Sequence, residues 1–207
     1  MPTGPIWRVG TNPTPLEPAE FLSEQQLEEM LISNLRILSP NWMLVGNQIN
    51  TGSGRIDILA ISRDGTLVVI ELKRHSTSRD VIAQTLEYLS WVHAQTPDII
   101  EELFLSNTGR ELGDAFREQF GVELDSDSLN AQQLAVIVAA RPNGATEQIV
   151  KYLTRVGVPI NLNTFEVFKN GDDLLMKPNW LVDLTVTEID SGGKGVWNLQ
   201  YYCSFGH

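Results

Sequence analysis

The chain lacks the features that mark disulfide-bonded, secreted and membrane-spanning proteins. Its only cysteine in 207 residues is Cys203, which excludes an intramolecular disulfide and fits a reducing compartment. It contains no apolar run near the roughly 18 residues that a membrane span requires. The first residues lack the charged and apolar segments of a signal peptide. We therefore expect a soluble, cytoplasmic protein with no membrane association.

Basic residues are also scarce, since 15 Lys and Arg stand against 26 Asp and Glu and the net charge is -11. This argues against a surface that coats nucleic acid, because phosphate binding requires clustered cations. Segment 55–79 differs, because basic residues outnumber acidic ones there. Its Arg55, Arg74 and Arg79 are candidates for contacting a phosphate backbone, and ordinary solvated surface charge is the alternative.

Several common site motifs are missing. The three histidines show no zinc-type spacing with Cys203, and no GxSxG, Walker or dinucleotide-binding glycine pattern occurs. The aromatic residues Trp197, Tyr201 and Tyr202 could stack on bases, but alternating aromatics of this kind are more typical of packing. The absences exclude the usual zinc, nucleotide and serine-hydrolase sites.

The hydrophobic pattern predicts an α/β fold with a mixed central sheet flanked by helices. Ser23 is expected to cap a first helix that ends near residue 39, before Pro40. Strands are expected at 42–49, 56–61 and 66–72, followed by a helix from residue 77 or 78 to about 95. The less regular region at about 98–130 is expected to hold one or two helices around 111–120. The order strand 134–140, helix 146–156 and strand 159–168 predicts a parallel crossover.

We expect three parts along the chain. Residues 1–20 form a short strand and a Pro-rich connector, and residues 21–177 form the α/β domain. Residues 178–207 are expected to form a small C-terminal β-hairpin extension, with its turn at 192–195, or the start of a further domain.

Glu71 and Lys73 are unusual because they lie two residues apart on a strand that is otherwise apolar on both faces. Residues at this spacing project from the same face of a strand. Burying two ionised groups costs several kcal/mol unless they pair with each other, a metal or solvent. They therefore form either a reaction site or a structural ion pair.

The turn at residues 63–65 decides whether Asp57 joins them. A three-residue loop, with Gly65 in the left-handed conformation, places Asp57 opposite Glu71 with Cβ atoms about 5 Å apart. A two-residue loop would place Asp57 opposite Leu72 instead. We prefer the first register because it gathers all three polar groups at one site.

Two carboxylates at that separation repel each other unless a cation lies between them. They suit a hard divalent ion such as Mg²⁺ or Mn²⁺, which prefers oxygen ligands. A metal held by Asp57 and Glu71 would neutralise a phosphodiester and help to deprotonate a water. Lys73 would hold or help to deprotonate that water, or stabilise charge in the transition state. These three residues are the centre of the expected site.

Residues on two neighbouring helices complete it. Gln84 and Tyr88 lie four apart, hence on one face of the helix that follows the Glu71 strand. Glu28, on the first helix, is a third carboxylate that could reach the metal or its waters, and Glu24 competes for that role. Taken singly, each is more typical of an exposed polar residue.

This ordered set resembles the PD-(D/E)XK nuclease superfamily and looks most similar to the endonuclease NucS-like catalytic domain. The matched elements are Glu28, residues 54–57, Glu71-x-Lys73, and Gln84 with Tyr88. Residues 134–168 also resemble the closing strand, helix and strand of such domains, so the resemblance covers about residues 20–170. Ile56 stands where the nominal motif has proline, which is frequent in divergent families.

The resemblance implies a restriction-endonuclease-like sheet and a metal-dependent endonuclease that cleaves phosphodiester bonds in DNA, in repair, restriction or defence. Mg²⁺ or Mn²⁺ would bind Asp57, Glu71 and the backbone carbonyl of Leu72. Tyr88 is expected at the DNA beside the three arginines. The expected catalytic residues are Asp57, Glu71, Lys73, Glu28 and Gln84. DNA is the expected partner, and a homodimer is an open alternative to a monomer.

The resemblance also has limits. NucS proteins place a substrate-guiding, dimerising domain ahead of this module, whereas here the module begins almost at the first residue. Mismatch specificity is therefore not carried over. Residues 197–207 also resemble a junction that leads into another domain in longer relatives, so we expect this chain to be short or truncated relative to them. A nuclease-fold module that binds nucleic acid or protein without cutting remains an alternative. So does a purely structural interaction domain.

Overall fold

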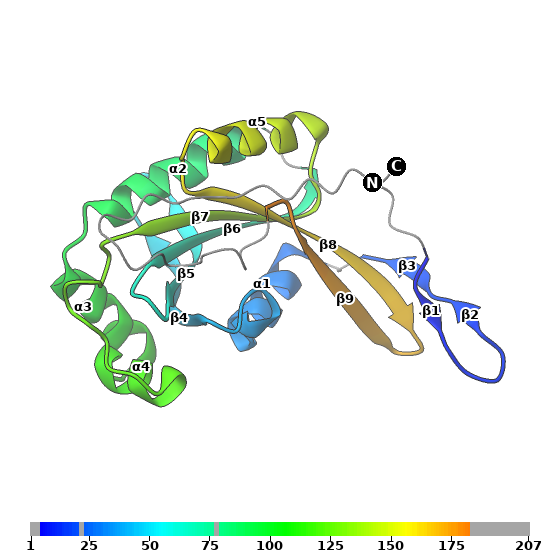
Figure 1. The fold of residues 1–207 in the computed structure, drawn as a ribbon, viewed down its shortest axis with the longest axis horizontal. Helices are drawn as coiled ribbons and strands as arrows, with labels where there is room; N and C mark the ends of the chain where they lie inside the picture. The colour runs from blue at the N-terminus through cyan, green and yellow to red at the C-terminus, as the bar shows by residue number, and fades with distance from the viewer. Residues whose placement is uncertain (1–4, 21–22, 77–78, 183–207) are drawn as a thin grey trace.

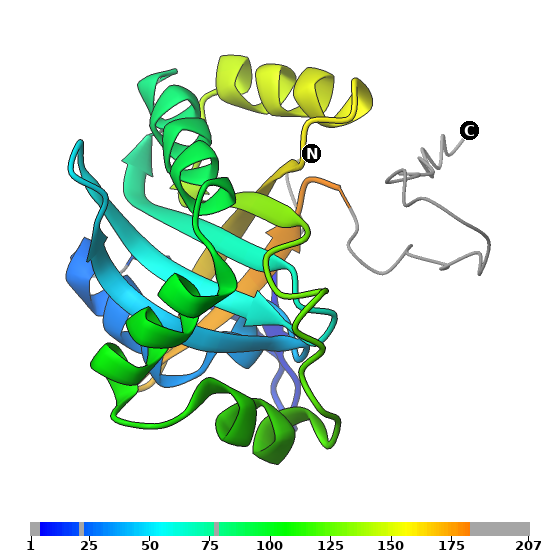
Figure 2. The ribbon, with the colours of Figure 1, turned by 90° about the vertical axis from the view of Figure 1, so that its left-hand side faces the viewer.

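The computed structural model describes residues 5–20, 23–76 and 79–182 of the chain. A seven-stranded mixed sheet runs through this part, with helices against both of its faces (Figures 1 and 2). The expected α/β architecture with a mixed central sheet is confirmed. No helix in these ranges is long and apolar enough to cross a membrane.

The elements follow the predicted order closely. The sheet strands are β3 (Glu17–Ala19), β4 (Trp42–Asn50), β5 (Arg55–Ser62), β6 (Leu67–Ser76), β7 (Gln133–Arg141), β8 (Ile160–Asn170) and β9 (Asp173–Trp180). The helices are α1 (Glu24–Ser33), α2 (Asp80–His93), α3 (Pro97–Thr108), α4 (Leu112–Phe120) and α5 (Gly144–Arg155), with a 3-10 turn η1 (Leu35–Ile37). The short strands β1 (Trp7–Arg8) and β2 (Thr14–Pro15) pair with each other outside the main sheet.

Connection length sets the direction of each strand. Short turns join β4 to β5 and β5 to β6, so these strands pair antiparallel. Helices intervene between β6 and β7 and between β7 and β8, and both of these pairs are parallel. The predicted parallel strand–helix–strand unit is therefore confirmed. Strands β9 and β3 both pair antiparallel with β8.

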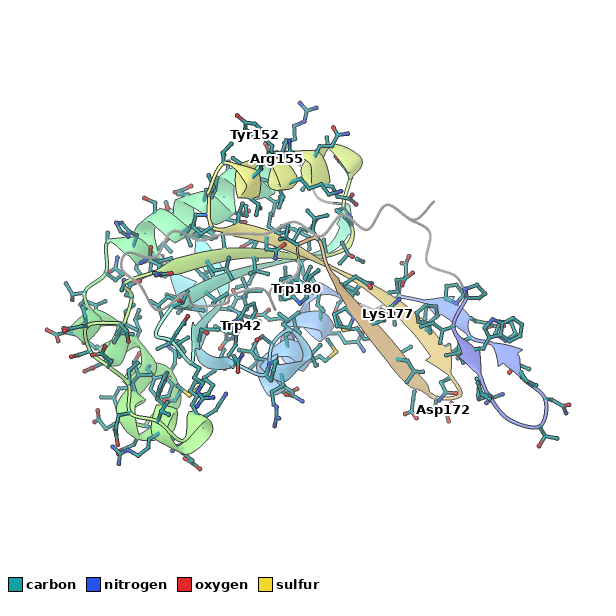
Figure 3. All side chains as sticks on the ribbon, in the orientation of Figure 1. Trp42, Tyr152, Arg155, Asp172, Lys177 and Trp180 are labelled. Carbon is teal, nitrogen blue, oxygen red and sulfur yellow. The ribbon has the colours of Figure 1, made fainter. Side chains whose placement is uncertain are left out.

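The sheet separates two apolar clusters. Helices α2 to α5 pack on one face, and α1 with η1 packs on the other. On the α1 face Trp42 of β4 and Trp180 of β9 meet edge to face, with ring centroids 5.8 Å apart (Figure 3). These residues come from opposite ends of the sheet, so its curvature brings the end strands together over α1.

Helix α1 begins as predicted but ends early. The Ser23 side chain accepts a hydrogen bond from the backbone N–H of Gln26 at 3.0 Å, as expected for a capping residue. The helix stops at Ser33, so the expected end near residue 39 is wrong. Asn34 leaves the helical conformation and accepts a hydrogen bond from the N–H of Arg36, which starts the 3-10 turn instead.

The start of α2 also differs from the expectation. The helix begins at Asp80, and Arg79 before it makes no side-chain capping bond. The expected caps, Thr77 and Ser78, lie outside the described residues. Further along, the expected one or two helices are two, α3 and α4, and Pro97 occupies the first turn of α3.

Both ends of the described chain contribute to the sheet. The Pro-rich connector expected before residue 20 contains β3, which pairs with the distal half of β8 and so tolerates Pro18 at a sheet edge. Strand β9 crosses the boundary expected between residues 177 and 178. The predicted hairpin turn at 192–195 lies outside the described residues.

Candidate active site

The turn between β5 and β6 is the three-residue loop on which the site depends. Ser62 donates its N–H to the carbonyl of Thr66 at 2.8 Å, which closes the loop over residues 63–65. Gly65 has φ +85, a conformation that an L side chain rarely adopts. The preferred loop, and not the two-residue alternative, is therefore the one observed.

This loop fixes the register of the two strands. Ile58 pairs with Ile70, and the pairs between them and the turn follow without a shift. Continuing the same count by one residue places Asp57 opposite Glu71, as predicted. The register on which the sequence argument relied is confirmed.

Asp57 is held by the neighbouring strand. Its Oδ2 accepts a hydrogen bond from the backbone N–H of Leu72 at 2.8 Å. Burial raises the pKa of Asp57, whereas the Leu72 hydrogen bond and the charge of Lys73 lower it and the charges of Glu28 and Glu24 raise it. The net pKa lies above its usual value, chiefly because the carboxyl is buried.

Glu71 is buried, with only 1% of its surface exposed. Its Oε1 lies 2.7 Å from the Nζ of Lys73, whereas Oε2 has no hydrogen-bond partner among the described residues. Burial, followed by the charge of Asp57, raises the pKa of Glu71 to about 7, although the hydrogen bond from Lys73 opposes the rise. A buried carboxyl oxygen without a partner is a group that a cation could satisfy.

Lys73 is a cation beside these two carboxyl groups. Burial acts to lower the pKa of its ammonium group, but the hydrogen bond and charge of Glu71, with the charge of Asp57, outweigh burial and raise the pKa. Its side chain is 30% exposed and so can be reached from solvent. A lysine that stays protonated is suited to stabilising negative charge or donating a hydrogen bond, and not to accepting a proton.

Both candidate carboxylates of α1 lie near the site. Glu28 accepts a hydrogen bond from the Nε2 of Gln48 at 2.7 Å, and the same nitrogen lies 3.5 Å from the Oδ1 of Asp57. Glu24 is one turn earlier, and its charge also contributes to raising the pKa of Asp57 after burial and nearer groups. Glu28 is thus linked to Asp57 through Gln48, whereas the charge of Glu24 acts on Asp57, Glu71 and Lys73. Both carboxylates therefore stay candidates.

Gln84 and Tyr88 lie together on α2, and the Tyr88 hydroxyl contacts the loop between β4 and β5. The Tyr88 hydroxyl accepts hydrogen bonds from the backbone N–H of Arg55 at 3.0 Å and from the Nε2 of Gln84 at 2.9 Å. A Cβ added at Gly54 would collide with that hydroxyl. Tyr88 is 3% exposed, and its hydroxyl anchors the loop that leads to Asp57. Its expected contact with DNA stays a prediction.

The expected arginine contacts are spread along the chain. Arg55 opens β5 and is exposed, and Arg79 is exposed directly before α2. Arg74 lies on β6, but its side chain is outside the described part of the structure. A role for these three in binding DNA stays a prediction.

The donor set for a metal is small. Across residues 5–20, 23–76 and 79–182, no group of three or more His, Cys, Asp or Glu side chains is arranged to hold a metal ion. The predicted set has two carboxylates and the backbone carbonyl of Leu72, so it does not require a third side chain. A cation that keeps several waters, as Mg²⁺ does, is the kind that such a set fits.

Sequence reasoning missed Gln48. Its alignment with Asp57 depends on a register shift between Leu44 and Gly46 and on the loop before β5. Neither feature has a sequence pattern from which the pairing of β4 residues with β5 residues could be predicted. The only available signal was a polar residue directly before the apolar Ile49 in a largely buried strand.

The chain matches known proteins over its first half. Residues 23–109 match the family described as the endonuclease NucS C-terminal domain. An endonuclease NucS from Thermococcus kodakarensis is 24% identical over 84 residues, which cover 41% of this chain and 33% of the relative. A second, from Methanopyrus kandleri, is 20% identical over 103 residues, which cover 50% and 40%. The chain is thus related to NucS endonucleases, and the match spans about a third to two fifths of those proteins' length.

Two solved structures also match part of the chain, both at low TM-score. A repair endonuclease from Pyrococcus abyssi gives a TM-score of 0.42 at 14% identity, covering 70% of this chain and 47% of that one. The EndoMS–dsDNA2 complex gives 0.43 at 15% identity, covering 77% and 64%.

Proposed function

We propose that this chain is a metal-dependent endonuclease of the PD-(D/E)XK type that hydrolyses phosphodiester bonds in DNA, in repair, restriction or defence. The relationship to NucS endonucleases supports the reaction class. The observation that carries the proposal is the register that sets Asp57 opposite Glu71, with Lys73 bound to one oxygen of Glu71. The second oxygen of Glu71 is buried without a hydrogen-bond partner among the described residues, which a bound cation would account for.

Asp57 and Glu71 would hold Mg²⁺ or Mn²⁺, together with the backbone carbonyl of Leu72. The bound cation supplies charge neutralisation at the scissile phosphate. Asp57 is already oriented for this role, because its other oxygen is fixed by the N–H of Leu72. Glu71 must lose its proton to bind the cation, and its raised pKa makes that loss dependent on pH near neutrality.

Lys73 would act on the phosphate and the attacking water through its protonated ammonium group. Hydrolysis forms a bond from water oxygen to phosphorus and breaks the bond to the leaving oxygen, which takes up a proton. Negative charge accumulates on the phosphate oxygens during this exchange, and a fixed ammonium group stabilises it. Glu28 and Asp57 both lie next to the Gln48 amide, so Glu28 would orient water beside Asp57.

A cleavage assay tests this function. Single-stranded, duplex and branched DNA are incubated with Mg²⁺ or Mn²⁺ and wild-type protein, Asp57→Asn or Lys73→Ala. We expect metal-dependent cleavage by the wild type and a loss of about 10²-fold or more in each variant. Lys177→Ala is the matched control, because this lysine pairs with Glu166 on the β8–β9 hairpin (Figure 3) and should cut normally. Equal cutting by all four proteins would show contamination and refute the assignment.

A non-cutting binding module is the second candidate. The net charge of -11 favours it, because an acidic chain is a poor general DNA binder. Absence of cleavage with every substrate, together with salt-dependent DNA binding, would support this alternative. Size-exclusion chromatography with light scattering in the same buffers decides between the monomer and the homodimer.

A further inference from the structure

Gln48 lies in line with the two carboxyl residues of the proposed site. Asn47 pairs with Ile58 and Ile49 pairs with Ile56, so Gln48 falls opposite Asp57 across β4 and β5. Asp57 falls opposite Glu71 on the other side. Three adjacent strands thus place the polar residues Gln48, Asp57 and Glu71 opposite one another.

The backbone of Gln48 is left-handed, with φ +52. A non-glycine residue rarely takes this conformation in a strand, because its Cβ is crowded there, and such residues gather at functional sites. Glycine would adopt the same backbone without the steric penalty. The backbone alone therefore does not account for glutamine at this position, and its side chain requires an explanation.

The Gln48 amide supplies that explanation. Its Nε2 donates to the Oε1 of Glu28 at 2.7 Å and lies 3.5 Å from the Oδ1 of Asp57. A primary amide nitrogen carries two hydrogens and no charge, so it can lie between two carboxylates without adding to their charge. Glu28 belongs to α1 and Asp57 to β5, so the amide joins a helix to the sheet at the site.

We propose that Gln48 is a positioning residue that holds Glu28 of α1 against Asp57, so that the two carboxylates act on one bound cation and its water. This inference rests on the proposed metal-dependent function. Removing a group that hydrogen-bonds to a metal ligand, and so orients it without touching the metal, commonly lowers metal affinity by about 10- to 100-fold. Gln48 is expected to act with that magnitude without touching the cation.

Two variants separate the side chain from the backbone. Gln48→Gly removes the amide and relieves the left-handed backbone, whereas Gln48→Asn keeps an amide and tolerates this conformation but is one methylene shorter. We expect both to unfold at temperatures no lower than the wild type and to bind Mn²⁺ about 10- to 100-fold more weakly by titration calorimetry. Gln25→Ala is the control, because Gln25 makes a similar bond to Glu29 at 2.8 Å on the exposed side of α1.

The route through Glu28 is tested by a double-mutant cycle. If Gln48 acts by holding Glu28, then Glu28→Ala with Gln48→Gly weakens Mn²⁺ binding no more than Glu28→Ala alone. Additive effects, or wild-type affinity in Gln48→Gly, would overturn the positioning role while leaving the metal site intact. Failure of the wild type itself to bind Mn²⁺ would overturn the proposed function, and this inference with it.

Discussion

The Oδ2 of Asp57 accepts a hydrogen bond from the backbone N–H of Leu72 at 2.8 Å, so a side chain serves as the acceptor where β5 and β6 cease to pair. The last cross-strand pair before it is Ile58 with Ile70. Asp57 is therefore part of the sheet as well as of the proposed site. Its two roles, satisfying a backbone donor and holding a cation, can be separated by substitution.

Asp57→Asn and Asp57→Ala should differ in stability but not in metal binding. Asparagine keeps an oxygen that can accept from Leu72, so we expect no loss of unfolding free energy. Alanine leaves that buried N–H without a partner, which costs about 1–3 kcal/mol. Urea unfolding measures the difference, and calorimetry with Mn²⁺ should show binding lost in both variants. Equal stabilities of the two variants would contradict the structural role of the Leu72 bond.

The raised pKa of Glu71 makes folding depend on pH. Its ordinary value is 4.5 and its folded value is about 7, so between these pH values the folded state holds a proton that the unfolded state releases. In metal-free buffer the wild type therefore loses stability as pH rises through this window, by up to about 3 kcal/mol. Glu71→Gln lacks this titration, so its stability relative to the wild type should increase from pH 5 to pH 8.

Thermal unfolding in EDTA across this pH range measures the difference in stability, here called the gap, between the wild type and Glu71→Gln. A gap that stays constant from pH 5 to pH 8 would show that Glu71 has no raised pKa. Adding Mn²⁺ at pH 8 should stabilise the wild type much more than Glu71→Gln, because the neutral amide is a far weaker ligand for the cation than the carboxylate.

Gly65→Ala tests the turn that sets the register. Its left-handed backbone penalises any side chain by about 1–2 kcal/mol, and an added Cβ would lie 2.6 Å from the carbonyl oxygen of Ser128. Gly171→Ala is the matched control, because Gly171 has φ +66 but nothing within 4 Å of the added atom. We expect a clearly larger loss of unfolding free energy at Gly65. Similar losses would mean that contact with Ser128 is unimportant.

The centre of the site could be predicted because it depends on local rules. The alternation of side chains along a strand puts Glu71 and Lys73 on one face. The length of the glycine-containing turn fixes the register of the two strands and so places Asp57 opposite Glu71. Both rules operate within about twenty residues of chain. The order of the elements along the chain and the parallel crossover followed from hydrophobic patterns of the same local kind.

What the sequence did not predict depends on contacts between distant segments. The hydrogen bond from the Arg55 N–H to the Tyr88 hydroxyl was not predicted, because a position on a helix says nothing of a contact with another segment. Gln48 was missed because a register shift and a left-handed backbone set its place. Helix α1 ends early at Asn34 because the Asn34 side chain accepts a hydrogen bond from the Arg36 N–H, which competes with the helical hydrogen bonds. Helix propensity alone does not predict which of these bonds forms.

Gly54 and Tyr88 should behave as a coupled pair. Tyr88→Phe leaves the Arg55 N–H without its acceptor, which costs about 1–2 kcal/mol. Gly54→Ala should cost more, because its methyl group collides with the Tyr88 hydroxyl while the rest of the ring is farther away. In the double variant the hydroxyl is absent, so the total loss should be smaller than the sum of the single losses.

Urea unfolding of the three proteins measures this coupling. Gly113→Ala is the control, because Gly113 lies in α4 with nothing within 4 Å of an added Cβ, and alanine favours a helix by about 0.5–1 kcal/mol. Strictly additive losses at Gly54 and Tyr88 would show that the hydroxyl does not set the loop. Since this loop leads directly into Asp57, Gly54→Ala should also weaken Mn²⁺ binding, and Tyr88→Phe should restore part of it in the double variant.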